Sequence, residues 1–222
     1  MTTRLQIADA YRRACRARVT ALTDRGIVLD QSCFFGPDDL VAPDRGRVAG
    51  HDVVGLRDLD GSLVHVIAPD IGGGTPAERL RVGELVDCTI DWLRRRRIMA
   101  LHTAQHLVEL AFQSTHDLTA VSSAPAGDHS LAMKPVLGSG CVDLEAINGW
   151  VETAVRDDLP MTVSAEPAPP YRWLWHLDGY GHRYCDGLHV RSTGEIDAIH
   201  VSHSDRATDE VLVSLERSSP DV

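Results

Sequence analysis

The first ninety residues alternate between short apolar or β-branched runs and polar turn segments. Two pairs of runs flank short polar segments as the strands of hairpins do: Ala17–Thr23 with Gly26–Asp30, and Val53–Leu56 with Leu63–Ile67. A further run, Leu85–Trp92, is rich in β-branched residues and partly alternates between apolar and polar positions. Several short strands with turns between them predict a small antiparallel β-barrel or sandwich.

The hydrophobic pattern changes to a helical period after Trp92. Between about Arg96 and Gln113, apolar residues recur at steps of three and four and predict one buried stripe, formed by Leu101, Ala104, Val108 and Ala111. A second helix is predicted over Leu144–Leu159, with Asp143 as its N-cap and Pro160 at its end. Short strands are expected around Thr162–Ala165, Trp173–Leu177, Glu195–Val201 and Glu210–Leu215.

These patterns predict an α+β protein with two domains. Residues 1–92 would form the small antiparallel β-barrel. Residues 93–222 would form an α+β domain in which helices pack on an antiparallel sheet.

Composition narrows the class of protein without naming a function. The chain has 222 residues, 43% hydrophobic and 24% charged, which is typical of a globular protein. A net charge of −10 argues against a general nucleic-acid coat but leaves room for a local basic patch. Five irregularly spaced cysteines do not suggest a disulfide framework, so a reducing cytoplasm is the expected setting. We expect neither a signal peptide nor a membrane span, because no apolar run approaches ~20 residues.

Two short motifs carry the candidate chemistry. His102 and His106 lie one turn apart on the predicted helix, so their rings project from the same side. Cys185 and His189 flank Gly187, which suggests a turn that lets both side chains point the same way. Three imidazoles and one thiolate suit tetrahedral zinc. A histidine pair at this spacing is more often a surface or core-edge pair, so the residues alone leave both interpretations open.

A family resemblance supports the metal interpretation. Ile90–Leu107 resembles the segment leading into the HxxxH helix of alanyl-tRNA editing domains. Cys185–Ile196 resembles their second metal motif, in which CxxxH precedes a Thr-Gly-Glu-Ile run. Leu144–Asn148 and Leu159–Val163 are similar to the intervening helix and strand. The related editing domain of threonyl-tRNA synthetases often has a charged residue and Gly after the Cys, as Asp186-Gly187 does here.

The resemblance implies a freestanding trans-editing protein of the AlaX type, an N-terminal β-barrel followed by an α+β editing domain. Such proteins are hydrolases that deacylate misacylated tRNA at the ester bond of its 3′ end, so the implied partner is the acceptor end of an aminoacyl-tRNA. The implied zinc ligands are His102, His106, Cys185 and His189. Zinc can lower the pKa of bound water to ~7 and polarise a carbonyl. Four protein ligands leave open whether zinc activates water or anchors the substrate.

Several residues depart from the family pattern at the expected substrate pocket. Cys33–Val41 stands in place of a glycine-rich loop of the family and keeps its aromatic pair but not its glycine run. Val121–Ala124 occupies the place of a loop Gln, and Leu188 that of a Thr. The predicted substrate contacts are Cys33, Phe34, Phe35, Gly36, Ser123 and Gly187. We expect a rebuilt pocket for a Ser/Thr-like or threonine-analogue amino acid such as fluorothreonine, because the family includes a fluorothreonyl-tRNA deacylase. Serine and glycine remain open.

Further candidates are weaker. Asp186 or His116 could orient water, although each also fits a surface or structural role. Arg94, Arg95, Arg96 and Arg97 could contact tRNA phosphates, or be a solvated run whose stems pack on the core. Two rival functions stay open: a non-catalytic zinc-containing tRNA-binding or regulatory module, and a hydrolase of small acyl esters. The sequence gives no indication of the oligomeric state.

Overall fold

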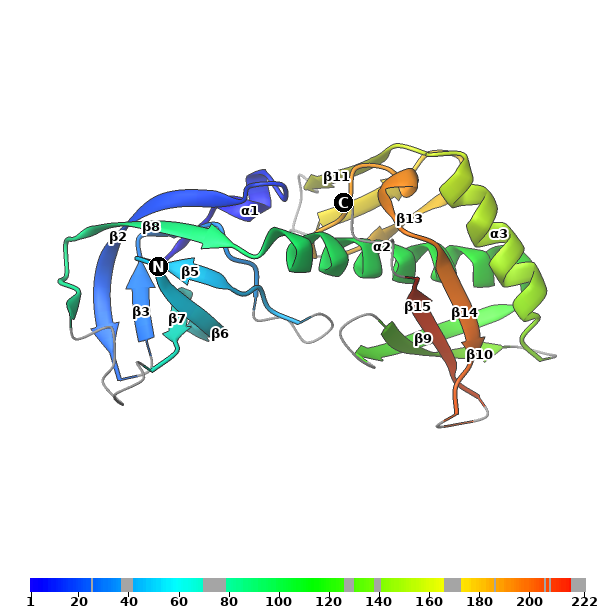
Figure 1. Cartoon of the computed structure of the whole chain (residues 1–222). Coiled ribbons are helices and arrows are strands. Elements are labelled where there is room, and N and C mark those ends of the chain that lie inside the picture. Colours follow the sequence, from blue (N-terminus) through cyan, green and yellow to red (C-terminus); the bar gives the residue numbers. More distant parts are fainter. Residues whose placement is uncertain are drawn as a thin grey trace. The chain divides into compact units, whose positions relative to one another are not determined.

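The structure is a computed structural model in which two compact units are recognised. It describes residues 1–24, 26–36, 42–69, 79–125, 130–137, 141–165, 173–185, 187–205, 207 and 209–216. The first unit spans Met1–Arg96 and the second Arg97–Val222 (Figure 1). This boundary lies close to the division expected at residue 92.

The first unit is built around a closed barrel of antiparallel strands. Its strands, in spatial order, are β2 (Ala14–Thr23), β3 (Gly26–Leu29), β7 (Ser62–Ile67), β6 (His51–Leu59), β5 (Gly46–Val48) and β8 (Leu85–Ile90). Both expected hairpins pair, β2 with β3 and β6 with β7. Outside the barrel, β1 (Thr3–Arg4) pairs in parallel with β4 (Gln31–Ser32), and α1 (Leu5–Ala8) lies between them in sequence.

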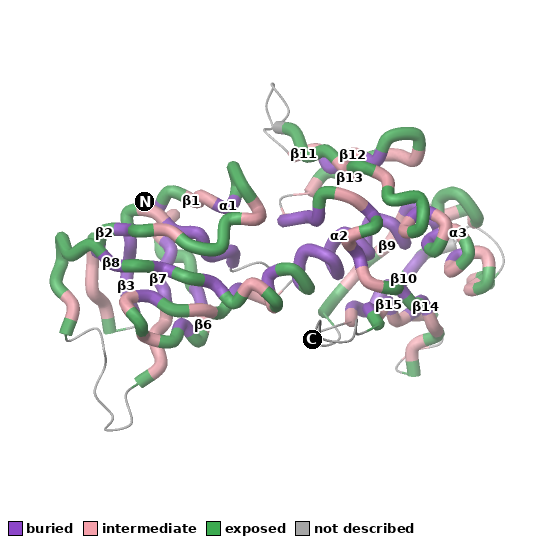
Figure 2. Tube along the Cα trace, turned by 45° about the horizontal axis from the view of Figure 1, so that its top comes forward, coloured by how far each residue is buried: buried purple, intermediate pink, exposed green. Residues whose placement is uncertain are grey.

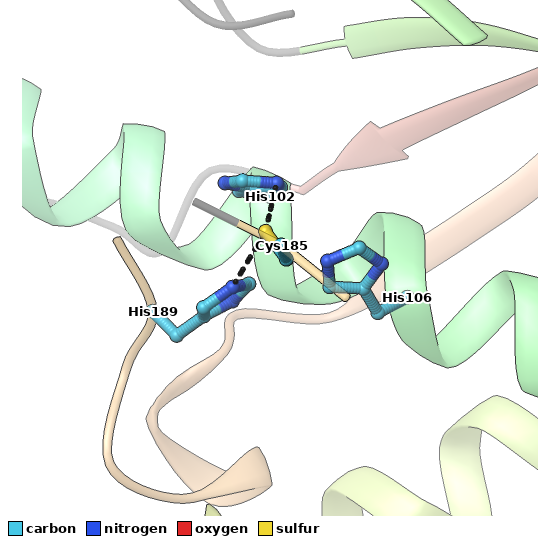
Figure 3. A group of neighbouring side chains, drawn as sticks. All are labelled: His102, His106, Cys185 and His189. Carbon is cyan, nitrogen blue, oxygen red and sulfur yellow. Dashed lines mark hydrogen bonds between the residues drawn. The ribbon is translucent and has the colours of Figure 1, made fainter. Parts of the chain in front are cut away.

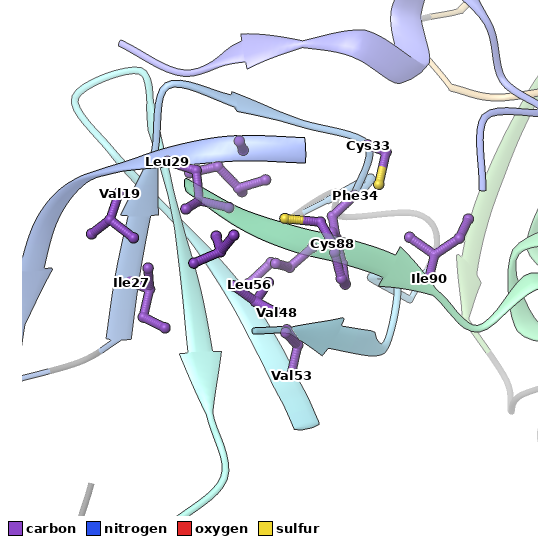
Figure 4. Close-up of a cluster of buried hydrophobic side chains, with 13 residues drawn as sticks. Val19, Ile27, Leu29, Cys33, Phe34, Val48, Val53, Leu56, Cys88 and Ile90 are labelled. Atoms are coloured by element: carbon purple, nitrogen blue, oxygen red, sulfur yellow. The ribbon is translucent and has the colours of Figure 1, made fainter. Parts of the chain in front are cut away.

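Alternation along the strands fills the interior of the barrel. In β8, every second residue is buried, which is the pattern of a strand with one face in the core. The buried cluster includes Leu29, Cys33, Phe34, Val48 and Cys88 (Figure 4). His65 is a buried polar member of this interior, and its ring nitrogens are bonded to the Ser32 hydroxyl and the Ile27 carbonyl.

Helix α2 (Trp92–Thr115) is longer than the expected span of 96–113 at both ends. Its start is capped by Asp91, whose side-chain oxygen accepts a hydrogen bond from the Arg94 backbone N–H at 3.1 Å. The stripe predicted from the sequence is buried, as are most of the residues between Ile98 and Phe112. The helix therefore forms the interior of the second unit rather than its surface.

The second unit surrounds α2 with two antiparallel sheets and one further helix. One sheet has the order β14 (Ile199–His203), β15 (Val211–Leu215), β10 (Ser130–Leu137), β9 (Leu118–Pro125). The other has the order β11 (Met161–Ala165), β12 (Trp173–Leu177), β13 (Gly181–Tyr184). Figure 2 shows buried segments in α2 and in β15.

Helix α3 (Leu144–Arg156) begins where expected, since the Asp143 side chain accepts the Ala146 backbone N–H at 3.0 Å. It ends before the predicted Leu159, because Asp158 adopts a positive φ of 47° that stops the helix. The strand expected from Glu195 is also wrong in its first part: Thr193–Glu195 form a short 3-10 helix, η2, and β14 begins at Ile199. Within the described ranges, no helix combines the length and apolar character that a membrane crossing needs.

Candidate metal centre

The two motif histidines of α2 lie next to each other inside the second unit. His102 and His106 are buried, with 1% and 5% of their surfaces exposed. Their ring centroids are 5.1 Å apart. One helical turn therefore places two imidazoles on the same side of the helix, as the sequence predicted.

The second motif brings a thiol and a third imidazole to the same place. Cys185 directly follows β13, and its backbone N–H is bonded to the Trp173 carbonyl at 2.9 Å. Its Sγ lies 3.2 Å from His102 Nε2 and 3.3 Å from His189 Nε2 (Figure 3). One ligand atom from each of the four side chains lies within 4.8 Å of the others. The four residues could therefore hold a metal ion.

A hydroxyl of α2 orients the ring of His189. Thr103 Oγ1 donates its proton to the Met99 carbonyl at 2.8 Å. The same oxygen must therefore accept from His189 Nδ1, which lies 3.1 Å away. The network assigns the ring proton to Nδ1 and leaves the Nε2 lone pair facing the Cys185 thiol.

A carboxylate orients the ring of His106 in the same way. Glu109 Oε2 lies 3.2 Å from His106 Nδ1 and 3.1 Å from Arg183 Nε. Glu109 Oε1 accepts from Gln105 Nε2 at 3.1 Å, and that amide also donates to Ser123 Oγ at 2.9 Å. Burial alone would raise the pKa of Glu109, but the hydrogen bonds from His106 and Gln105 and the charge of Arg183 lower it.

The state of the imidazoles suits a bound cation. His106 Nε2 and His102 Nδ1 are buried and have no hydrogen-bond partner among the described residues, an arrangement that costs about 1–3 kcal/mol per group. Burial lowers the pKa of His102 to about 3 and that of His189 well below its ordinary value. Both rings are therefore neutral near pH 7 and can donate lone pairs. A cation among the four side chains would supply the partner that His106 Nε2 lacks.

Gly187 leaves room for the ring of His102. A Cβ atom at this position would lie 1.7 Å from His102 Cε1 and 2.1 Å from its Nδ1. The Gly187 backbone N–H also points to Cys185 Sγ, at 3.3 Å. The structure thus gives Gly187 a role in packing the candidate ligands, and its predicted contact with substrate stays a prediction.

Trp175 closes the other side of the group. Its side chain is fully buried, and its ring centroid lies 5.1 Å from that of His106 and 5.8 Å from that of His189. Leu188, between the ligands of the second motif, is also buried. An apolar wall of this kind keeps water from the imidazoles and strengthens electrostatic interactions within the group.

The described part of the predicted substrate loop, Cys33–Gly36, lies mostly inside the first unit. Cys33 and Phe34 are fully buried members of the barrel core, so their side chains are occupied by packing. Phe35 is buried as well, and its backbone N–H donates to Asp44 Oδ2 at 2.7 Å. Gly36 has a φ of +127° and its carbonyl accepts from Arg4. The substrate contacts predicted for these residues stay predictions; residues 37–41 lie outside the described ranges.

The two predicted water-orienting residues receive no support. Asp186 lies outside the described residues. His116 Nδ1 lies 2.6 Å from Thr115 Oγ1, and its Nε2 accepts the Asp143 backbone N–H at 2.9 Å. Both ring nitrogens of His116 are engaged by residues other than the four candidate ligands, which argues against the predicted role in orienting water.

The arginine run divides into buried and exposed members. The prediction that Arg95 contacts tRNA is wrong, because its guanidinium is fully buried against Asp44 and also donates to the Cys33 and Ala10 carbonyls. Arg94 is half-buried and donates to the Pro43 carbonyl at 3.1 Å. Arg96 and Arg97 are exposed. For those two the tRNA contact stays a prediction.

Sequence reasoning missed the residues that orient the imidazoles. Glu109 follows His106 by three positions, a spacing that puts both on one helix face and could have pointed to it. Arg183 precedes Cys185 by two positions, so strand alternation places both on one face. No local pattern links Thr103 to His189, because that contact joins residues far apart in the chain.

The amino-acid sequence is similar to those of proteins named for alanyl-tRNA editing and for alanine–tRNA ligation. No family model matches the chain. The chain is similar to proteins of two kinds, alanyl-tRNA editing proteins and alanine–tRNA ligases. The chain spans about half the length of the editing relatives and about a quarter of the ligases.

Particular relatives show how far the similarity extends. An "Alanyl-tRNA editing protein AlaX-M" of Pyrococcus horikoshii is 34% identical over 110 residues, 49% of this chain and 48% of the relative. The protein of the same name from Methanosarcina mazei is 36% identical over 115 residues, 49% and 45% of the two chains. The "Alanine--tRNA ligase" of Pyrobaculum neutrophilum is 27% identical over 249 residues, 95% of this chain and 26% of the ligase.

Proposed function

We propose that this protein is a zinc-dependent hydrolase that removes the amino acid from misacylated tRNA by cleaving the ester at the tRNA 3′ end. One observation carries the proposal: the four donor atoms converge in a chain whose relatives are named for alanyl-tRNA editing. The reaction class agrees with that site, since ester hydrolysis needs a polarised carbonyl and an activated water.

The donor set favours zinc over harder cations. Three imidazole nitrogens and a thiolate suit Zn²⁺, whereas Mg²⁺ and Ca²⁺ prefer oxygen ligands. When bound, zinc would polarise the ester carbonyl or lower the pKa of a coordinated water. The residues that would hold the ion are His102 and His106 from α2, and Cys185 and His189 from the segment after β13.

The proposed substrate carries a Ser/Thr-like amino acid or a threonine analogue such as fluorothreonine. Support comes from the sequence, where the loop Cys33–Val41 lacks the glycine run usual in alanyl-type domains and Leu188 stands where they often have Thr. Leu188 is buried and directly precedes the candidate ligand His189 in the chain. We propose the exposed Arg96 and Arg97 as contacts for the phosphates of the acceptor end.

A deacylation panel tests the function. Purified protein is incubated with seryl-, glycyl-, alanyl-, threonyl- and fluorothreonyl-tRNA, and the rate of ester loss is measured for each. We expect the threonyl or fluorothreonyl ester to be cleaved fastest, and Cys185→Ala or His106→Ala to abolish cleavage. Cys141→Ala and His203→Ala are matched controls at positions outside the ligand group and should keep wild-type rates.

Each other outcome of the panel points to a different conclusion. Strong preference for serine on alanine tRNA would contradict the rebuilt pocket. Equal cleavage of a small ester mimic and of the tRNA ester would indicate an ester hydrolase without tRNA specificity. Failure on every aminoacyl-tRNA, with zinc bound, would indicate a non-catalytic module. Full activity in a zinc-free variant would remove zinc from the mechanism.

A further inference from the structure

Glu109 occupies a central position beside the candidate metal centre without being one of its ligands. Its side chain is 14% exposed, and each carboxylate oxygen accepts hydrogen bonds from the surrounding protein. A carboxylate so far removed from water needs partners that balance its charge. The partners found here come from two elements of the second unit, α2 itself and β13.

The first partner is a candidate ligand itself. Glu109 Oε2 lies 3.2 Å from His106 Nδ1, and a carboxylate can only accept at this distance. The His106 proton is therefore held on Nδ1. The other nitrogen, Nε2, is buried and has no hydrogen-bond partner among the described residues, so its lone pair is the one left for an ion.

The second partner ties the same carboxylate to the strand that leads to Cys185. Arg183 Nε donates to Glu109 Oε2 at 3.1 Å, and Arg183 lies on β13, two residues before Cys185. Helix α2 carries the candidate ligands His102 and His106, and β13 ends directly before Cys185. The ion pair between Glu109 and Arg183 therefore links α2 to the strand that leads to a third candidate ligand. Gln105 adds a link to β9 by bonding both Glu109 and Ser123.

We propose that Glu109 is the positioning residue of the metal centre: it orients His106 as an Nε2 ligand and, through Arg183, sets the spacing between α2 and Cys185. Ligands oriented in advance bind an ion more tightly, and loss of such a partner typically weakens metal affinity about 10–100-fold. The inference rests on the proposed metal-dependent function but concerns metal affinity and geometry rather than the choice of substrate.

The experiment measures zinc affinity by competition with a chromophoric chelator, in the full chain. Glu109→Gln keeps the size of the side chain and removes its charge. We expect zinc to bind this variant about 10–100-fold more weakly than wild type. The Co²⁺-loaded variant should also lose intensity in the ligand-field bands of tetrahedral cobalt, a change that a purely structural defect remote from the ion would not produce.

Two further variants complete the design. Glu152→Gln makes the same chemical change on the exposed surface of α3 and should keep wild-type affinity. Arg183→Gln removes the ion pair with Glu109, together with an exposed hydrogen bond to the His182 carbonyl, and leaves the Glu109–His106 contact in place, so we expect a weaker loss in the same direction. This variant also keeps the inference testable if Glu109→Gln does not fold.

The outcomes separate this inference from the proposed function. Wild-type zinc affinity and an unchanged cobalt spectrum in folded Glu109→Gln, or in Arg183→Gln if the first variant does not fold, would overturn the positioning role alone. A wild-type protein that binds no zinc would overturn the metal centre and this inference together. Weakened zinc binding in Glu109→Gln, with no aminoacyl-tRNA cleaved by wild type, would support the positioning role and overturn the deacylase.

Discussion

At the scale of single residues, the candidate centre depends on Gly187 as well as on the four candidate ligands. Gly187 has the tightest surroundings among the glycines of the second unit that the structure describes, because the His102 ring lies where a Cβ would be. The absence of a side chain at Gly187 therefore leaves the space that the ring of His102 occupies.

Substituting this glycine tests that dependence. We expect Gly187→Ala to displace the His102 ring and to weaken zinc binding by more than the roughly 10–100-fold typical of losing an outer partner. The measurement is zinc affinity by chelator competition. Gly149→Ala is the matched control, since nothing lies within 4 Å of its would-be Cβ on α3, and its zinc affinity should match wild type. Unchanged affinity in Gly187→Ala would contradict the close packing.

Residue-level prediction from sequence succeeded where the information is local. His102 and His106 share a helix face by their spacing alone, and the Cys185–His189 motif is equally short. The ligand atoms converge as expected. The roles of Arg95 and Ser123 could not be predicted from local patterns. Arg95 is bonded to Asp44, and Ser123 is bonded to Gln105, and each pair joins residues that are far apart in the chain.

At the scale of elements, α2 shows why a hydrophobic pattern locates a helix better than it bounds one. The apolar stripe predicted from the sequence begins at Leu101, but the start of the helix contains four consecutive arginines, Arg94–Arg97. Their placement there follows from tertiary contacts: Asp91 caps the helix, and Arg95 is buried against Asp44. A cation near a helix N-terminus is electrostatically unfavourable. For Arg95, the buried ion pair with Asp44 compensates for this cost.

This ion pair gives a stability prediction at the start of α2. Asp44→Ala leaves the Arg95 guanidinium buried without its carboxylate, which typically costs about 3–5 kcal/mol. We expect a loss of that size in the free energy of unfolding, measured by urea denaturation. Asp52→Ala, which removes the exposed partner of Arg47, should change the same quantity by about 1 kcal/mol or less. Equal effects of the two substitutions would contradict the buried role of Arg95.

At the scale of the whole molecule, the ligands come from segments that are far apart in the chain. His106 and Cys185 are separated by β9, β10, α3, β11, β12 and β13, all within the second unit. The sequence predicted α3, β11 and β12 in this region but missed β9, β10 and β13. It also did not predict the order of the two sheets, because pairing such as β10 with β15 depends on long-range register. An ion bound at the centre would cross-link this long stretch.

Removal of the ion should therefore affect the two units differently. A ligand that binds only the folded state stabilises it by about 4 kcal/mol at a free concentration a thousandfold above Kd. We expect a chelator to accelerate amide hydrogen exchange in β12, β13 and the second half of α2, and to leave β2 and β8 unchanged. Mass spectrometry of peptic fragments measures both. Equal acceleration in the barrel strands would contradict the assignment of the stabilising ion to the second unit.

The position of Trp175 beside the candidate centre has an optical consequence. Its indole is fully buried and lies beside two candidate ligand rings, those of His106 and His189. Indole fluorescence is sensitive to the electronic state of a neighbouring imidazole. The chain therefore contains its own optical probe at the centre, and the arrival or departure of an ion can be followed in real time without an attached dye.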